Sequence, residues 1–239
     1  MLEVVAVPAF SDNYIWLVHD PASGETAVVD PGDGEAALAA ADDRGWTIGQ
    51  VWNTHWHGDH TGGNRLVKDV TGCSVSGPAT EAIPARDIAL REGDVVRLGR
   101  CVGKVIEVPG HTLGHIAFVF EDAGIAFVGD TLFAMGCGRL FEGSPEQMYN
   151  SLQRLAALPP ATALYAAHEY TLSNARFAAD ADPGSSEVRE RLRGIEARRA
   201  RGEITLPTSV AEERKTNPFV RAKDADEFAA LRRRKDSFG

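Results

Sequence analysis

Seven histidine and aspartate side chains are the part of this sequence best suited to chemistry. The chain has only seven histidines, and three of them lie between positions 55 and 60. Neutral imidazoles and carboxylates are the ligands that zinc, iron and manganese take in proteins. Seven such groups exceed the needs of one tetrahedral ion with an open position, but they suit two ions that share a carboxylate, as in two-metal hydrolases. The seven candidate metal ligands are His55, His57, Asp59, His60, His111, Asp130 and His168.

Each group of candidate ligands follows a predicted strand. Residues 51–54 form the expected strand before the histidine cluster, and Gly62 and Gly63 let the chain turn into the next helix. The spacing of two between His55 and His57 fits neither a helix face nor a zinc finger, and therefore indicates a loop. The other three ligands follow the apolar runs 102–108, 125–128 and 164–167. Ligands at the ends of several strands could converge on a rigid base.

The remaining pattern predicts a mixture of strands and helices, so the fold class is α/β or α+β. Short β-branched or apolar runs bounded by turn residues predict strands at 4–7, 14–18, 26–29 and 116–120. Helices are expected at 36–41 and 64–70, and the capping box of Ser144 and Gln147 predicts another helix start. After about residue 171 only helical patterns remain, so we predict a catalytic domain over 1–172 and a helical domain over 173–239.

The composition excludes several classes of function. A net charge of −9 argues against general nucleic-acid binding, and no apolar run is long enough to span a bilayer. The start of the chain has no secretory signal pattern, and three widely spaced cysteines fit a reducing cytosol. Residues 173–239 carry 15 Lys and Arg against 12 Asp and Glu, so this segment is basic on an acidic body. That asymmetry fits either an anionic ligand or a solvated helical face.

The ligand pattern resembles that of the metallo-β-lactamase superfamily, and more closely that of the glyoxalase II (hydroxyacylglutathione hydrolase) family. The signature His-x-His-x-Asp-His is matched by 55–60, followed by the later His, Asp and His. The segments 109–112 and 129–133 also belong to the superfamily at large. Two further matches, 168–171 and Asn217-Pro218-Phe219 with the ending 232–238, are more specific to the hydrolase family.

The resemblance implies an αβ/βα sandwich followed by a small all-α C-terminal domain. It implies two divalent metal ions, zinc first, with iron or manganese as alternatives. One ion would be bound by His55, His57 and His111, the other by Asp59, His60 and His168, and Asp130 would bridge the two.

The implied reaction is hydrolysis of S-D-lactoylglutathione to D-lactate and glutathione, in methylglyoxal detoxification. A hydroxide between the ions, held by Asp59 and Asp130, would attack the thioester. The resemblance places glutathione contacts at Arg139, Tyr170, Arg232 and Lys235. Arg139 stands where a lysine is common and Phe141 where a tyrosine is common, so one hydrogen bond to glutathione would be lost. We expect a cytoplasmic monomer whose partner is a small-molecule thioester.

Three other functions are compatible with the ligand set. Another hydrolase of the superfamily would act on a lactone, a different thioester or a phosphodiester. A glutathione persulfide dioxygenase would need a single iron and would lack the helical domain. A non-catalytic binding domain would be expected to have lost a ligand, and none of the seven is lost here.

Overall fold

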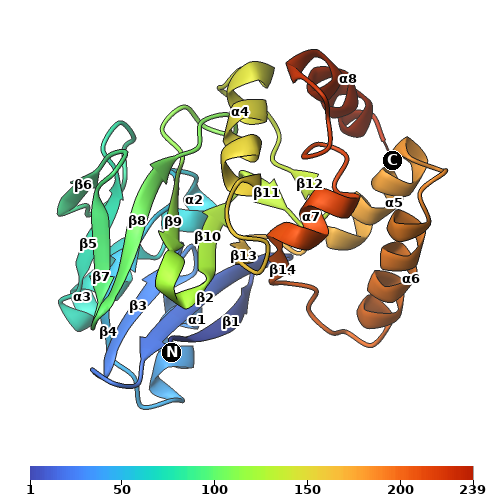
Figure 1. Cartoon of the computed structure of the whole chain (residues 1–239). Coiled ribbons are helices and arrows are strands. Elements are labelled where there is room, and N and C mark those ends of the chain that lie inside the picture. The colour runs from blue at the N-terminus through green and yellow to red at the C-terminus, as the bar shows by residue number, and fades with distance from the viewer. Residues whose placement is uncertain (239) are drawn as a thin grey trace. The chain divides into compact units, whose positions relative to one another are not determined.

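The computed structural model describes residues 1–238, which form two compact units (Figure 1). The first unit contains residues 1–107 and 114–129, and the second contains 108–113 and 130–239. Both units mix strands with helices, as the sequence predicts. The units interleave along the chain, and the predicted domains 1–172 and 173–239 stay a prediction.

The first unit begins with a six-stranded mixed sheet. Its strands occur in chain order, with β1–β2 and β2–β3 antiparallel and the later pairs parallel. The strands are β1 (Glu3–Ala9), β2 (Asn13–Asp20), β3 (Glu25–Val29), β4 (Ile48–Trp52), β5 (Ser74–Pro78) and β6 (Ile88–Leu90). Helices α1 (Gly34–Asp42), α2 (Gly58–Thr61) and α3 (Asn64–Thr71) belong to the same unit.

The first unit also holds four antiparallel strands, β7 (Val95–Leu98), β8 (Cys101–Glu107), β9 (Ile116–Phe120) and β10 (Ile125–Gly129), with a 3₁₀ turn at Glu121–Ala123. Trp52 on β4 packs against Phe118 and Phe120 on β9, with ring centroids 5.8 and 5.5 Å away. A second apolar cluster joins the six-stranded sheet to α1 and α3, through residues such as Leu17 and Val67. The six-stranded sheet is therefore covered by helices and by the other strands, which holds the ends of β4 and β10 rigidly.

The second unit is mainly helical. It contains the hairpin of β11 (Leu132–Phe133) and β12 (Gly136–Cys137), helix α4 (Pro145–Ala156), and the antiparallel pair β13 (Ala163–Ala166) and β14 (Thr208–Ser209). Its other helices are α5 (Thr171–Ala181), α6 (Ser186–Ala200), α7 (Val210–Thr216) and α8 (Ala225–Asp236). Helix α5 packs against α6, and α4 packs against α8.

Several local predictions are confirmed. Ser144 caps α4 with Gln147 in a complete capping box, and Met148, Leu152 and Leu155 form the buried stripe of that helix. All five residues of β10 are buried, as the continuous apolar run predicts. One expectation is wrong in detail, because the segment after 171 includes the two-residue strand β14. That strand pairs with β13, and so short a run leaves no period to read in the sequence. No helix among residues 1–238 is both long and apolar enough to cross a bilayer.

Candidate metal centre

The histidine cluster lies in the first unit, in the loop after β4 and in the short helix α2. Asn53 pins this loop, since its Nδ2 donates to the carbonyl oxygen of His60 at 3.0 Å. The loop passes so close to Gly32 that a Cβ there would lie 1.8 Å from the carbonyl oxygen of Asp59. Only glycine fits at position 32, and the tight contact fixes the backbone that carries the ligands.

Asp30 orients the buried histidines of this loop. One of its oxygens, Oδ2, accepts from the hydroxyl of Thr54 at 2.7 Å and from Nδ1 of His60 at 3.1 Å, and Oδ1 accepts from Thr54 N at 2.8 Å. The Thr54 hydroxyl donates to Asp30 and so accepts from Nδ1 of His55, 3.1 Å away. Both imidazoles thus carry their proton on Nδ1, which leaves Nε2 as the ligand atom.

Four candidate ligands of the first unit form two pairs, and the ligand atoms of each pair lie at the separation expected for donors to one ion. Nε2 of His55 lies 3.1 Å from Nδ1 of His57, and Nε2 of His60 lies 3.5 Å from Oδ2 of Asp59. Ligand atoms at about 2.0–2.1 Å from a tetrahedral ion stand roughly 3.3 Å apart. Asn13 holds the second pair in place, because its Nδ2 donates to Oδ2 of Asp59 at 2.9 Å.

The second unit brings a matching set of ligands together. Oδ2 of Asp130 lies 3.3 Å from Nε2 of His111 and 3.4 Å from Nε2 of His168. Nδ1 of His111 donates to the carbonyl oxygen of Arg139 at 2.9 Å, which again leaves Nε2 as the ligand atom. The ring of His168 stacks on Tyr170, with centroids 4.7 Å apart and planes 2° from parallel. A carboxylate oxygen between two imidazoles is the arrangement that a bridging ligand requires.

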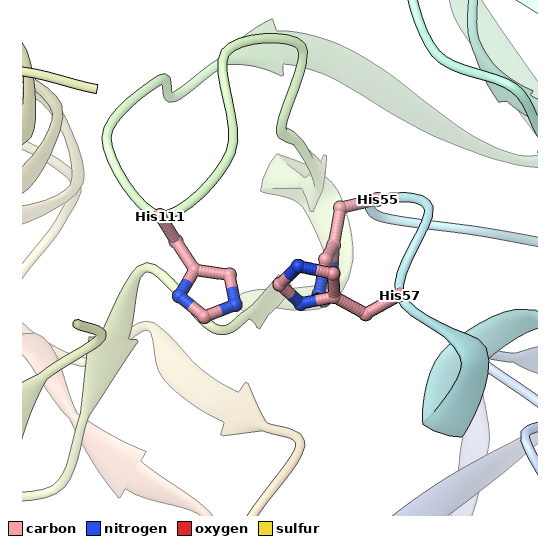
Figure 2. A group of neighbouring side chains, drawn as sticks. All are labelled: His55, His57 and His111. Atoms are coloured by element: carbon pink, nitrogen blue, oxygen red, sulfur yellow. The ribbon is translucent and has the colours of Figure 1, made fainter. Parts of the chain in front are cut away.

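Among residues 1–238, three groups of side chains could each hold a metal ion, because the ligand atoms within a group all lie within 4.8 Å of one another. Figure 2 shows the first group, in which the rings of His55, His57 and His111 turn toward one another. The second group combines Asp30 with His55 and His60, and the third combines Asp59, His60 and His168. Imidazole and carboxylate donors at these separations fit a divalent metal, and the assignment of the ligands to two ions stays a prediction.

Sequence reasoning missed Asp30 and Asn13. Both make their contacts across long stretches of chain, so no local spacing identifies them. The available signal was weak: Asp30 is a charged residue directly after the apolar strand β3, and it takes a left-handed backbone conformation with φ of 51°. The ring of His115 stacks on His55, with centroids 4.7 Å apart.

The four predicted glutathione contacts all lie in the second unit. Arg139 and Tyr170 are exposed, and Lys235 donates from Nζ to the hydroxyl of Ser173 at 2.8 Å. Partial burial, followed by the positive charges of Arg232 and Arg139, lowers the pKa of the Lys235 ammonium. Arg232 and Arg139 therefore both lie within electrostatic reach of Lys235, a grouping that favours an anionic ligand.

Arg232 differs from the other three in being buried. Its Nη1 donates to the carbonyl oxygen of Cys137 at 2.9 Å, and its Nη2 pairs with Asp236 at 2.7 Å. The guanidinium also lies over the ring of Phe219, 5.2 Å from the centroid. Phe141, where a tyrosine is common, is exposed and places its ring edge-on to His111 at 5.3 Å.

Comparison with known proteins supports the resemblance along the whole chain. The model of the metallo-β-lactamase superfamily matches residues 9–168, and that of the hydroxyacylglutathione hydrolase C-terminus matches 169–238. A protein of Methylococcus capsulatus named hydroxyacylglutathione hydrolase is 50% identical, over 100% of this chain and 99% of its own. A protein of the same name from Erythrobacter litoralis is 49% identical over the full length of both chains.

Solved structures agree with these sequence relatives. The crystal structure of ETHE1 from Myxococcus xanthus superposes with a TM-score of 0.75 at 27% identity, covering 98% of this chain and 90% of its own. The structure of TTHA1623 in a di-iron-bound form has a TM-score of 0.64 at 25% identity, covering 91% of this chain and 99% of its own. The predicted fold class is confirmed, with a metallo-β-lactamase fold followed by a helical C-terminal part. The chain therefore belongs to the metallo-β-lactamase superfamily and, within it, to the hydroxyacylglutathione hydrolase family.

Proposed function

We propose that this protein hydrolyses S-D-lactoylglutathione to D-lactate and glutathione, and so acts in methylglyoxal detoxification. The full-length relatives at about 50% identity carry the name hydroxyacylglutathione hydrolase, which supports this reaction. The observation that carries the proposal is that one chain combines imidazole–carboxylate groups at metal-ligand separations with a cluster of cations around Lys235.

The proposed cofactors are two divalent ions, with zinc preferred. One ion would be held by His55, His57 and His111, the other by Asp59, His60 and His168, and Asp130 would be shared. The separations between the ligand atoms support both sets, and the structure of a relative in a di-iron-bound form supports two ions. When bound, the ions supply a Lewis acid and a nucleophile derived from water at neutral pH.

The protein's own side chains orient the reacting groups. Asp30 and Arg139 O fix the tautomers of three histidines, and Asn13 fixes the carboxylate of Asp59. The leaving group of a thioester is a thiolate whose conjugate acid has a pKa of about 8.5, so it departs without a strong general acid. No further proton donor is needed for the reaction, and Asp59 and Asp130 act in this proposal as ligands.

Glutathione carries two carboxylates, and the cationic cluster of the second unit supports their binding. Lys235 and Arg139 would bind them directly, because Arg139 is exposed, Lys235 is partly exposed, and the charge of Arg139 acts on Lys235. Tyr170 offers an exposed ring and hydroxyl beside His168. The second unit would in this way select the glutathione part of the substrate through these residues.

The proposed domain boundary is at residue 172, and the two family models meet close to it, at 168 and 169. A cytoplasmic location is proposed as well, and the three free cysteines support a reducing compartment. The monomeric state stays a prediction.

The test is hydrolysis of S-D-lactoylglutathione by purified protein, followed through loss of the thioester absorbance, with metals counted in the same preparation. A panel of other thioesters, lactones and phosphodiesters provides the comparison. We expect lactoylglutathione to be the best substrate, with about two ions per chain. A lactone or phosphodiester turned over faster would contradict the proposal. One iron per chain with oxygen uptake would instead identify a persulfide dioxygenase.

A further inference from the structure

The hairpin β11–β12 connects three of the candidate ligands in the second unit. Asp130 precedes it by two residues, and Arg139, whose carbonyl oxygen accepts from His111, follows it by two. The ring of Phe133 on the hairpin lies edge-on to His168, with centroids 5.9 Å apart. The backbone also closes tightly here, because a Cβ on Gly138 would lie 1.9 Å from the carbonyl oxygen of Asp130. A shift of the hairpin would therefore move or release all three ligands together.

The hairpin has too few ladder bonds to hold itself in place. Its two strands have two residues each, and the turn between them contains Met135 with a φ of 58°, in the left-handed region. A two-residue pair is far shorter than an ordinary strand, so its position must be imposed from outside. The polar groups of the turn show what imposes it.

Two buried residues of the C-terminal part form hydrogen bonds with the turn. Asn217 donates from Nδ2 to the carbonyl oxygens of Phe133 and Gly136, at 3.2 and 2.9 Å. Glu213, which is fully buried, accepts from the backbone N–H of Met135 at 2.8 Å through Oε2, and this same oxygen accepts from Asn217 at 2.8 Å. Glu213 lies within α7 and Asn217 caps its C-terminus, and Asn174 of α5 adds a third contact by donating from Nδ2 to the carbonyl oxygen of Ala134 at 3.3 Å.

The other side of this pair is anchored away from the hairpin. Oε1 of Glu213 accepts from Arg191 at 2.7 Å and from the hydroxyl of Thr208 at 2.6 Å. Oδ1 of Asn217 accepts from Phe219 N at 3.0 Å. A buried carboxylate that accepts from four donors has little freedom to move, so it can fix the position of whatever it touches.

We propose that Glu213 and Asn217 are positioning residues for metal binding, a role that depends on the proposed function. Glu213 and Asn217 hold the hairpin in position, and the hairpin in turn positions the Asp130 carboxylate. The chain after the hairpin places the carbonyl oxygen of Arg139, which fixes the tautomer of His111. Their effect is therefore on the affinity of the second unit's ligands for metal as well as on stability. Outer residues that orient metal ligands typically change metal affinity about 10–100-fold when they are mutated.

The experiment compares three variants by the Zn²⁺ affinity of the folded apoprotein, measured by competition with a chromophoric chelator. Asn217→Ala removes the grip on the turn, and Glu213→Gln replaces an acceptor with a donor. Thr208→Val is the matched control, because it removes a hydrogen bond from the same carboxylate on the side away from the hairpin. We expect about tenfold weaker Zn²⁺ binding in the first two variants and no more than a small change in the control. Equal affinities in all three would overturn the proposal.

A measurement on the unaltered chain decides the matter even if both variants fail to fold. Coupling between two sites is reciprocal. If the hydrogen bonds from Glu213 and Asn217 to the turn strengthen Zn²⁺ binding, Zn²⁺ binding must stabilise those hydrogen bonds. Added Zn²⁺ should slow hydrogen exchange at the Met135 amide more than at the Glu212 amide, which is capped by Ser209 on the same helix. Equal slowing at both amides would refute the coupling. Neither readout requires thioester hydrolysis, so a wrong substrate assignment would not be mistaken for failure of this inference.

Discussion

Replacing Asp30 with asparagine changes one polar atom in a buried side chain, and its consequences follow from the hydrogen bonds around it. Asp30 is 3% exposed and accepts from three donors: Thr54 N, the Thr54 hydroxyl and Nδ1 of His60. Asparagine has one acceptor oxygen and one donor nitrogen at the end of its side chain. Either orientation of the new amide therefore sets a donor against a donor.

The two orientations have different consequences. If the amide nitrogen faces Thr54 N, a buried backbone donor loses its partner, at a cost of about 1–3 kcal/mol. If it faces His60 instead, the imidazole must carry its proton on Nε2, and the metal-ligand atom is blocked. In the Asp30→Asn protein, keeping the proton of His60 on Nδ1 therefore costs about 1–3 kcal/mol. This cost corresponds to roughly 5–150-fold weaker metal binding through His60.

The assay is Zn²⁺ affinity by chelator competition, with kcat for lactoylglutathione measured at the same metal occupancy. The matched control is Asp33→Asn, because Asp33 caps α1 by accepting from Ala36 N and asparagine caps helices about as well. We expect Asp30→Asn to weaken binding within that range and Asp33→Asn to leave it unchanged. An Asp30→Asn protein with native metal affinity would show that tautomer control by Asp30 is unimportant.

Four further outcomes are expected. Lys235→Ala should raise KM for lactoylglutathione with little change in kcat, while the exposed Lys223→Ala should change neither; an unaltered KM would exclude Lys235 from substrate binding. The pKa of the Lys235 ammonium is lowered, so the affinity of the unaltered enzyme for lactoylglutathione should fall with rising pH, and at a lower pH than the pKa of an ordinary lysine would give. This fall should be absent from the pH profile of Lys235→Ala. Burial raises the pKa of Cys137 to about 11, so a thiol reagent at pH 8 should label it only on unfolding; labelling in the native state would contradict its burial. Ser144→Ala should lower the free energy of unfolding by about 1 kcal/mol without changing Zn²⁺ affinity, as measured by denaturant unfolding and chelator competition.

Local chemistry made part of this structure predictable. The start of α4 follows from Ser144, Pro145 and Gln147 alone, because the capping box needs only residues three positions apart. The strand β9 has the bounds 116–120 that its apolar run predicts. The seven candidate ligands were found because donor type and clustering are visible in the sequence, and two groups of three have converging ligand atoms.

The residues that sequence reasoning missed act over long distances. Asp30 reaches His60 across 30 positions, and Glu213 reaches Met135 across 78. Neither contact produces a period or a spacing, and both residues look locally like ordinary turn or helix residues. The motif 217–219 is recognisable in the sequence only through family resemblance, whereas its hydrogen bonds to the turn of the hairpin appear only in the folded structure.

The basic charge of the C-terminal segment shows why net charge is a weak guide to binding. Several of its arginines form ion pairs within the second unit, such as Arg191 with Glu213, Arg221 with Asp182 and Arg234 with Asp180. These pairs hold helices together and neutralise much of the charge that suggested an anionic ligand. What distinguishes Lys235 is a lowered pKa, caused first by burial and then by the charges of Arg232 and Arg139, so a bound anion would stabilise its charged form. A single substitution at Lys235 should therefore raise KM more than charge removal at Arg221, and the opposite order would locate the carboxylates of the substrate elsewhere.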